Sequence, residues 1–258
     1  SFLGVPYIDV RVSFNSFIPK KLDELIAEKL VNHYLNELEK NKSLHDKVEF
    51  EIVYSCYYFG IEKKLDRLKN NNFTNIEISE IQNNLLEITN IIIHPIDGLY
   101  KKDLRELEKL KKVTDDIVSS KLSLIDKIYW LIKDVKRYGT LPFAGAARSA
   151  FVAIQFLKSF ISEGIINEKE YNLFLKSLNT VSKSLVKDKN ILNKKDFLDK
   201  YGHLRPGTYD ILSKNYEQNY ENYFSKENND YIEEEIFTFS ASQKKCINEK
   251  LLNYKLNV

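Results

Sequence analysis

The residues best suited to chemistry form one short run, Tyr-Gly-His-Leu-Arg-Pro-Gly-Thr-Tyr-Asp-Ile, at positions 201–211. Helix-type apolar spacing leads up to this run and then stops. Its Pro-Gly pair favours a type II turn, and the residue before the proline is restricted to an extended conformation. We therefore expect a turn that presents the side chains of His203, Arg205, Thr208 and Asp210.

Two interpretations of this turn are open. Loop residues that are held by a rigid scaffold often carry function, which favours a binding site with His203 as its catalytic candidate. The alternative is a structural corner that is closed by an ion pair between Arg205 and Asp210.

Arg148 is the second unusual residue. It lies in the small-residue stretch 141–151, which opens a long apolar helix, and we expect it in or near the first turn. A cation there opposes the helix dipole and costs roughly a few tenths of a kcal/mol unless an anion lies beside it. Free N–H groups and a guanidinium could bind a carboxylate or phosphate together. The alternative is an ion pair with a neighbouring Asp or Glu.

Two further polar candidates lie near the N-terminus. Apolar and polar residues alternate from residue 6 to 14, which predicts a half-buried strand with Arg11 and Asn15 on its polar face. Residues 48–54 alternate in the same way and predict a second strand. Arg11 could therefore contribute to a site or pair with a carboxylate of the neighbouring strand.

The remaining pattern is helical. We expect a mainly α fold with a small β-sheet near the N-terminus, of the α+β class, in which residues 1–56 form a strand-helix-strand part and residues 57–258 a mostly helical substrate-binding part. A break is expected at Gly139-Thr140-Leu141-Pro142. Predicted helices cover residues 20–41, 61–70, 77–93, 101–120, 122–138, about 145–160, 168–186, 194–201 and 242–252.

Composition excludes several classes of function. The 39 basic and 37 acidic residues give a net charge of +2, which does not indicate nucleic-acid binding. Cys56 and Cys246 are the two cysteines, so neither a disulfide framework nor a metal site is expected. No apolar run approaches the roughly 18 to 20 residues of a membrane span, and no secretory signal is evident, so we expect a cytoplasmic protein.

The usual catalytic motifs are missing. The sequence has no P-loop, no Rossmann glycine motif, no His-Glu-x-x-His and no Gly-x-Ser-x-Gly. The chain has groups that could hold a substrate and few that could transform it. A component of a larger enzyme explains this imbalance better than a complete enzyme does.

Three segments carry a resemblance to a known family. Pro-Tyr-Ile-Asp-Val-Arg-Val-Ser-Phe-Asn-Ser-Phe-Ile-Pro at 6–19, His-Asp-Lys-Val-Glu-Phe-Glu-Ile at 45–52 and Tyr-Gly-His-Leu-Arg-Pro-Gly-Thr-Tyr-Asp at 201–210 resemble the central region of phosphoenolpyruvate-synthase-like phosphotransferases. Within that family the sequence is most similar to the L-glutamine kinase branch of capsular phosphoramidate biosynthesis. The last segment also resembles, more loosely, the Tyr-Gly-His-Arg-Gly-x-Gly-Glu run of rifampicin phosphotransferases.

The resemblance implies a division of labour among domains. An ATP-grasp-like domain and a swivelling phosphohistidine domain of the same polypeptide would use ATP and Mg²⁺, release AMP and phosphate, and deliver the phosphoryl group to an acceptor held by this region. Neither domain's motifs occur in this sequence, so no cofactor is expected within the chain. The implied acceptor is the amide of L-glutamine.

Roles for the candidate residues follow from this chemistry. An acceptor carboxylate would pair with Arg148 or Arg205, and His203 would donate near the phosphoryl group. Asp210 would orient His203 or receive a substrate amine. Thr208, Arg11 and Asn15 complete the expected binding set. The competing hypothesis is a helical scaffold or docking module without a ligand of its own.

Overall fold

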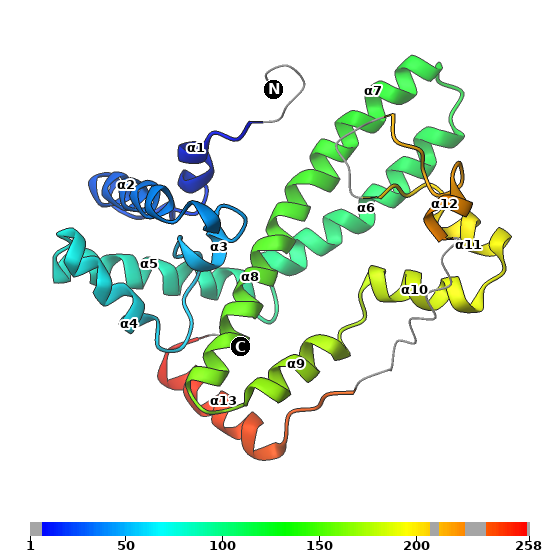
Figure 1. Cartoon of the computed structure of the whole chain (residues 1–258). Coiled ribbons are helices and arrows are strands. Elements are labelled where there is room, and N and C mark those ends of the chain that lie inside the picture. The colour runs from blue at the N-terminus through cyan, green and yellow to red at the C-terminus, as the bar shows by residue number, and fades with distance from the viewer. Residues whose placement is uncertain (1–6, 207–211, 225–235, 257–258) are drawn as a thin grey trace. The chain divides into compact units, whose positions relative to one another are not determined.

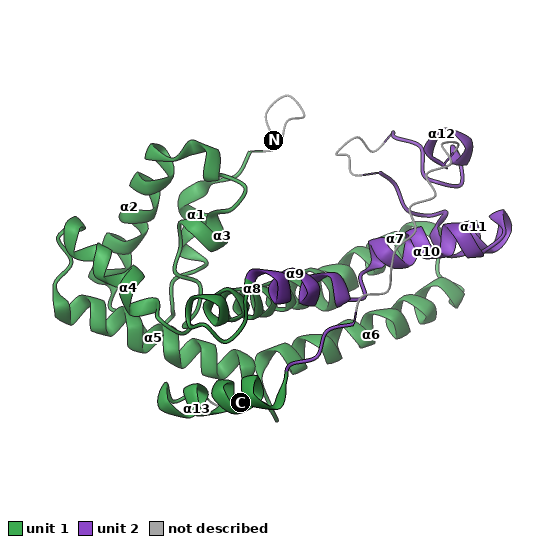
Figure 2. Cartoon of the chain, turned by 60° about the horizontal axis from the view of Figure 1, so that its bottom comes forward, with its two compact units in different colours: residues 1–167, 240–258 green, residues 168–239 purple. Residues whose placement is uncertain are grey.

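The computed structural model describes residues 7–206, 212–224 and 236–256, and each regular element among them is helical (Figure 1). The chain divides into two compact units, unit 1 with residues 1–167 and 240–258 and unit 2 with residues 168–239 (Figure 2). No strand occurs in the described residues, so the prediction of a small N-terminal β-sheet, and with it the α+β class, is wrong. The fold is mainly α.

Unit 1 contains most of the helices. In chain order they are α1 (Val10–Asn15), α2 (Glu24–Lys40), the 3₁₀ turn η1 (Lys42–Leu44), α3 (Val48–Glu51), α4 (Ile61–Leu65), the 3₁₀ turn η2 (Asp66–Asn71), α5 (Asn75–Ile93), α6 (Leu99–Ser119), α7 (Leu124–Asp134), the π-helical turn η3 (Val135–Thr140), α8 (Leu141–Ser162) and α13 (Ala241–Asn253). Those of unit 2 are α9 (Glu168–Ser177), α10 (Val181–Ile191), α11 (Lys194–Tyr201) and α12 (Tyr220–Phe224).

The first predicted strand is the helix α1. The Asp9 side chain caps it by accepting the Val12 N–H at 3.1 Å. Of the alternating apolar residues, Phe14 is buried with 1% exposure, whereas Ile8 and Val12 are 78% and 64% exposed. The alternation therefore does not mark one buried face, and the local cap determines the conformation.

The second predicted strand is also not extended along its length. Its first half is the short helix α3, and the segment from residue 52 to 57 is a buried irregular connection. The N–H of Tyr54 donates to the hydroxyl of Tyr34 on α2 at 3.1 Å, and the N–H of Tyr57 donates to Oγ1 of Thr89 on α5 at 2.7 Å. Side chains thus satisfy the backbone donors that a neighbouring strand would otherwise satisfy.

The core of unit 1 lies where α2, α4 and α5 meet the buried connection. Tyr34, Ile61 and Ile81 are each 0% exposed. α5 begins with a capping box in which Thr74 and Glu77 satisfy each other's backbone N–H groups. Oε1 of Glu77 also accepts a hydrogen bond from Nζ of Lys29 at 2.8 Å, which connects the start of α5 to α2.

The predicted break at residues 139–142 is absent, because α7, η3 and α8 run on as one helix (Figure 1). The π-helical turn lies just before Pro142, which has no N–H to donate to the preceding turn.

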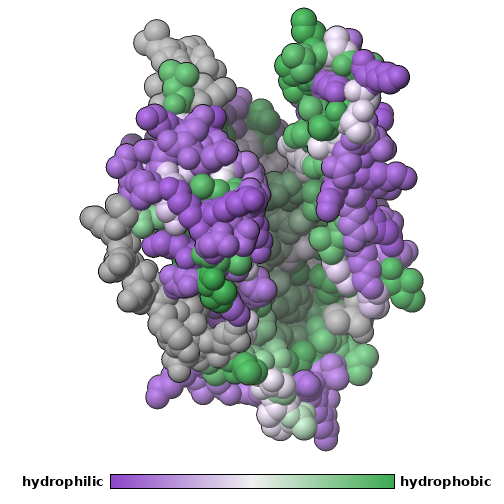
Figure 3. Space-filling model, turned by 90° about the vertical axis from the view of Figure 1, so that its right-hand side faces the viewer, coloured by the Kyte–Doolittle hydropathy of each residue, from purple (hydrophilic) through white to green (hydrophobic). Residues whose placement is uncertain are grey.

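By length and composition alone, this stretch of 39 residues is apolar enough to cross a membrane, contrary to the expectation from sequence. Soluble core helices meet the same criterion, although only 28% of its apolar window is buried. Figure 3 shows hydrophobic side chains at the surface on the side of the molecule that it views.

Candidate functional site

Arg148 does not lie at a helix start. It follows two turns of α8, and η3 continues α7 directly into that helix. The N–H groups around it are therefore engaged in the helix, and the predicted anion site at a free helix terminus is wrong. The isolation of the Arg148 charge has another origin.

The guanidinium of Arg148 contacts the end of α1. Its Nη2 donates to the carbonyl oxygen of Ser16, the residue that caps α1, and its Cζ lies 5.9 Å from the centroid of the Phe17 ring. Burial lowers the pKa of Arg148 from its usual value. The alternative ion pair with an Asp or Glu does not form within the described ranges. A half-buried positive charge therefore has a neutral carbonyl and a ring as its contacts.

A carboxylate lies on the same side of α8. A Cβ atom built on Gly145 would be 1.9 Å from Oδ2 of Asp103 on α6, so the Asp103 carboxylate occupies the space that the missing side chain leaves. Residues three apart lie on one face of a helix, which places the Gly145 contact next to Arg148. Burial raises the pKa of Asp103, and no described residue bonds its carboxylate. Asp103 of α6 and Arg148 of α8 thus each lack an ion-pair partner among the described residues.

Arg11 and Asn15 lie on α1 four residues apart, and therefore on one face of that helix. Nη2 of Arg11 donates to Oδ1 of Asn32 on α2 at 3.0 Å, so the expected partner, a carboxylate of a second strand, is replaced by an amide. Asn15 is exposed and directly precedes Ser16, which Arg148 binds. The structure thus brings Arg148 to the end of α1 that carries Asn15.

The turn after α11 belongs to unit 2, and its described part is anchored by backbone bonds. The N–H of Tyr216 donates to the carbonyl of Leu204 at 2.9 Å, and the N–H of Glu217 donates to that of Gly202 at 3.1 Å. His203 and Arg205 are both exposed at this anchored turn. Thr208 and Asp210 lie outside the described residues, so the pairing of Asp210 with His203 or with Arg205 stays a prediction. Arg148 and Arg205 belong to different units.

Asp188 fixes the helix that leads into this turn. Its Oδ2 accepts Nζ of Lys200 at 2.6 Å and the hydroxyl of buried Tyr201 at 2.7 Å. These two hydrogen bonds, with Lys200 the larger contributor, lower the pKa of the Asp188 carboxyl.

Acid is therefore expected to loosen α11. Because the pKa of Asp188 is lower in the folded than in the unfolded state, where it is about 3.9, the ionised carboxylate stabilises the fold at pH values above about 3.9. This stabilisation is lost as the pH falls through the pKa of the folded state. Asp188→Asn should reduce the hydrogen-exchange protection factors of α11 at pH 7 and remove their fall at acidic pH. Asp199→Asn, on the exposed side of α11, is the control. Equal protection in the two variants at pH 7 would contradict this role.

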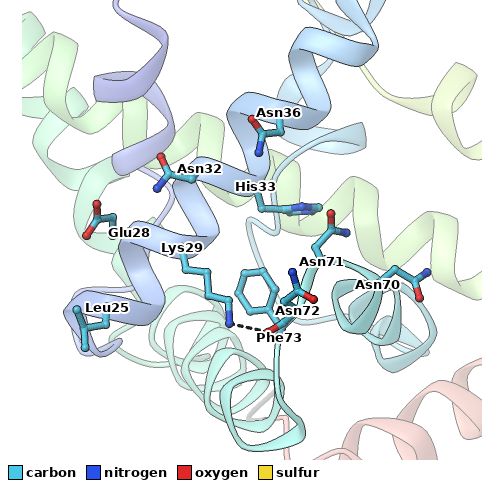
Figure 4. Close-up of a pocket in the computed structure, with 10 residues that line it drawn as sticks. All are labelled: Leu25, Glu28, Lys29, Asn32, His33, Asn36, Asn70, Asn71, Asn72 and Phe73. Carbon is cyan, nitrogen blue, oxygen red and sulfur yellow. Dashed lines mark hydrogen bonds between the residues drawn. The ribbon is translucent and has the colours of Figure 1, made fainter.

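A polar pocket between α2 and the end of η2 was missed by sequence reasoning (Figure 4). Its cavity volume is about 460 Å³. Nζ of Lys29 crosses it to the carbonyl of Asn72 at 2.8 Å, and the ring of His33 projects from α2 toward Asn71. The one signal in the sequence is the run Asn70-Asn71-Asn72, which lies between the predicted helices 61–70 and 77–93.

In the part of the chain that the structure describes, no group of three or more His, Cys, Asp or Glu side chains is placed to hold a metal ion. Cys56 is buried and unpaired, and burial raises the pKa of its thiol to about 12, so it is a poor nucleophile. No family model, curated protein or solved structure matches the chain.

Proposed function

We propose that this chain is the acceptor-binding region of a cytoplasmic ATP-dependent phosphotransferase, in which a phosphohistidine on another domain of the polypeptide phosphorylates the amide of L-glutamine. The observation that carries the proposal is the half-buried guanidinium of Arg148, which contacts no carboxylate among the described residues. An anionic group on a ligand would supply the missing partner, since charge-assisted bonds to a planar guanidinium are strong and directional.

Asp103 supports an amino acid as that ligand. A free amino acid carries a carboxylate and an ammonium group a few ångströms apart. Arg148 could bind the first and Asp103 the second, because Asp103 of α6 lies against α8 at Gly145, three residues before Arg148. Each charge would then be neutralised by the ligand.

The phosphoryl group would need cationic donors of its own. His203 and Arg205 are exposed on the anchored turn of unit 2 and offer an imidazole and a guanidinium for this purpose. ATP and Mg²⁺ would be bound by the other domains. In this scheme unit 1 selects the acceptor.

Titration calorimetry with L-glutamine tests the proposal. Arg148→Ala should weaken binding by about tenfold or more, because a hydrogen bond to a charged group contributes about 1.5–3 kcal/mol. Arg105→Ala on α6 removes an equal charge from an exposed position and should leave the affinity unchanged. Asp103→Asn should weaken the binding of L-glutamine but not that of glutaramate, which is the same molecule without its amino group. Equal affinities in Arg148→Ala and the unsubstituted chain would refute the assignment.

One observation favours the second candidate, a helical docking module. Leu124, Ile125 and Phe143, on the long helix that α7 and α8 form, are 79%, 79% and 69% exposed. Apolar side chains exposed together often mark a surface that another protein covers. No saturable heat with L-glutamine, together with a gain in solubility on Ile125→Glu, would favour this alternative.

A further inference from the structure

A second, smaller pocket adjoins the one in Figure 4. It lies between α2, the buried connection after α3 and the helical turns α4 and η2, with a cavity volume of about 210 Å³. The two pockets share His33, Asn70 and Asn71 as a common wall. None of the residues proposed to bind L-glutamine lines either pocket. The one link is Asn32, which lines the larger pocket and whose Oδ1 accepts a hydrogen bond from Arg11.

Two cations and two carboxylates line the small pocket. Lys64 and Arg67 line it from the same helical face, three residues apart. Nζ of Lys64 donates to the carbonyl of Phe50 at 3.1 Å and lies 5.4 Å from the centroid of the Tyr54 ring, so its contacts are uncharged. Arg67 is exposed at the rim, and no hydrogen bond or ion pair engages it in the described residues.

The two carboxylates that line the pocket have ion-pair partners outside its lining. Glu37 accepts Nζ of Lys40 at 3.0 Å, and Glu51 lies 3.7 Å from Nζ of Lys158. Glu51 also acts electrostatically on Lys64. When Lys40 and Lys158 are counted with the lining residues, the cluster has more positive than negative side chains. Two positive charges in a confined space suit a dianion.

His33 adds an unused hydrogen-bonding atom. Its Nδ1 is buried and has no partner, the one such side-chain atom in the described part of the chain. A buried polar atom without a partner typically costs about 1–3 kcal/mol, which a ligand could recover. The imidazole stands between the two pockets, so a ligand that fills both would pass beside it.

The larger pocket is rich in side-chain amides. Asn32, Asn36 and Asn72 line it in addition to the shared Asn70 and Asn71. An amide offers both donors and an acceptor, so this wall suits a hydroxylated or otherwise polar organic group more than an apolar one.

From these observations we propose that the paired pockets bind a phosphomonoester, with its phosphate between Lys64, Arg67 and His33 and its organic group against the asparagines. A phosphomonoester carries about 1.5 to 2 negative charges at neutral pH, which suits the excess of positive side chains in this cluster. This site is independent of the proposed acceptor site, because Arg148 and Asp103 take no part in it.

The test uses the full chain and two probes, sodium phosphate and glycerol 2-phosphate, titrated at constant ionic strength. Arg67→Ala should weaken the binding of both probes by about tenfold or more, since it removes a charge-assisted hydrogen bond. Lys63→Ala is the matched control, because it removes one charge from an exposed position on α4, directly before η2. Asn36→Ala should weaken the binding of glycerol 2-phosphate but not that of phosphate. The NMR resonances of the His33 ring should shift when either probe binds.

Three results would overturn the proposal: no saturable binding of either probe, equal losses in Arg67→Ala and Lys63→Ala, or glycerol 2-phosphate binding no tighter than phosphate. Equal losses in the two variants would mean that only the overall charge matters. Equal affinities for the two probes would mean that the asparagines do not contact the organic group. Arg148→Ala should leave phosphate binding unchanged. Failure of this site and failure of the L-glutamine site can therefore be told apart.

Discussion

Phe14→Ala is expected to lower the free energy of unfolding of unit 1 by about 3–4 kcal/mol, the usual cost of truncating a buried phenylalanine. Phe14 is 1% exposed, is the one buried residue of α1, and meets the ring of Tyr34 edge to face at 5.7 Å. A helix of six residues is unstable without such packing. Its loss should also detach the Ser16 carbonyl from Arg148.

Chemical denaturation followed by circular dichroism measures this effect. Val12→Ala is the control, because Val12 lies on the same helix and is 64% exposed. Its change should stay within about 0.5 kcal/mol, as for most surface substitutions. A loss below about 1 kcal/mol for Phe14→Ala would mean that α1 contributes little to unit 1 and does not position Arg148.

The N-terminal region shows why alternation misled the sequence analysis. Val10, Val12 and Phe14 repeat every second residue as in a strand, but the cap from Asp9 starts a helix and only Phe14 is needed for packing. Later, Ile52 and Tyr54 are buried because the whole connection is enclosed, and the N–H groups of Tyr54 and Tyr57 donate to side-chain hydroxyls. Neither the cap nor those distant hydroxyls can be inferred from a period of two.

The long helices were easier to predict, because their apolar spacing is sustained over many residues. The predicted helices 77–93 and 101–120 correspond closely to α5 and α6. The continuous helix through Pro142 was missed because a π-helical turn depends on packing, including that of Gly139 against Leu110.

The candidate sites were only partly accessible from sequence. An unusual setting drew attention to Arg148, although the contacts of its guanidinium are at the end of α1 and not at a helix start. Asp103 and His33 gave no signal, since each becomes notable only through tertiary contacts: a glycine on another helix and a buried Nδ1. Residues that function through distant neighbours are invisible to local spacing.

Thr89→Val is expected to cost about 2 kcal/mol of unfolding free energy, because it leaves a buried N–H without a partner. Oγ1 of Thr89 accepts the N–H of Tyr57 and donates to the carbonyl of Leu85, both at 2.7 Å, and the side chain is 0% exposed. Valine has nearly the same shape, so packing is preserved while the hydrogen bond is lost. The Leu85 carbonyl keeps its helical partner and should contribute little.

Thr89→Ser separates the hydroxyl from the methyl group. Serine keeps the bond to Tyr57 and loses one buried methyl, at about 1 kcal/mol. The expected order of stability in urea denaturation is therefore threonine, serine, valine. The reverse order of the two variants would show that methyl packing, not the hydrogen bond, holds the buried connection. Since Ile52 and Tyr54 of that connection line the small pocket, the valine variant should also bind glycerol 2-phosphate more weakly than the serine variant.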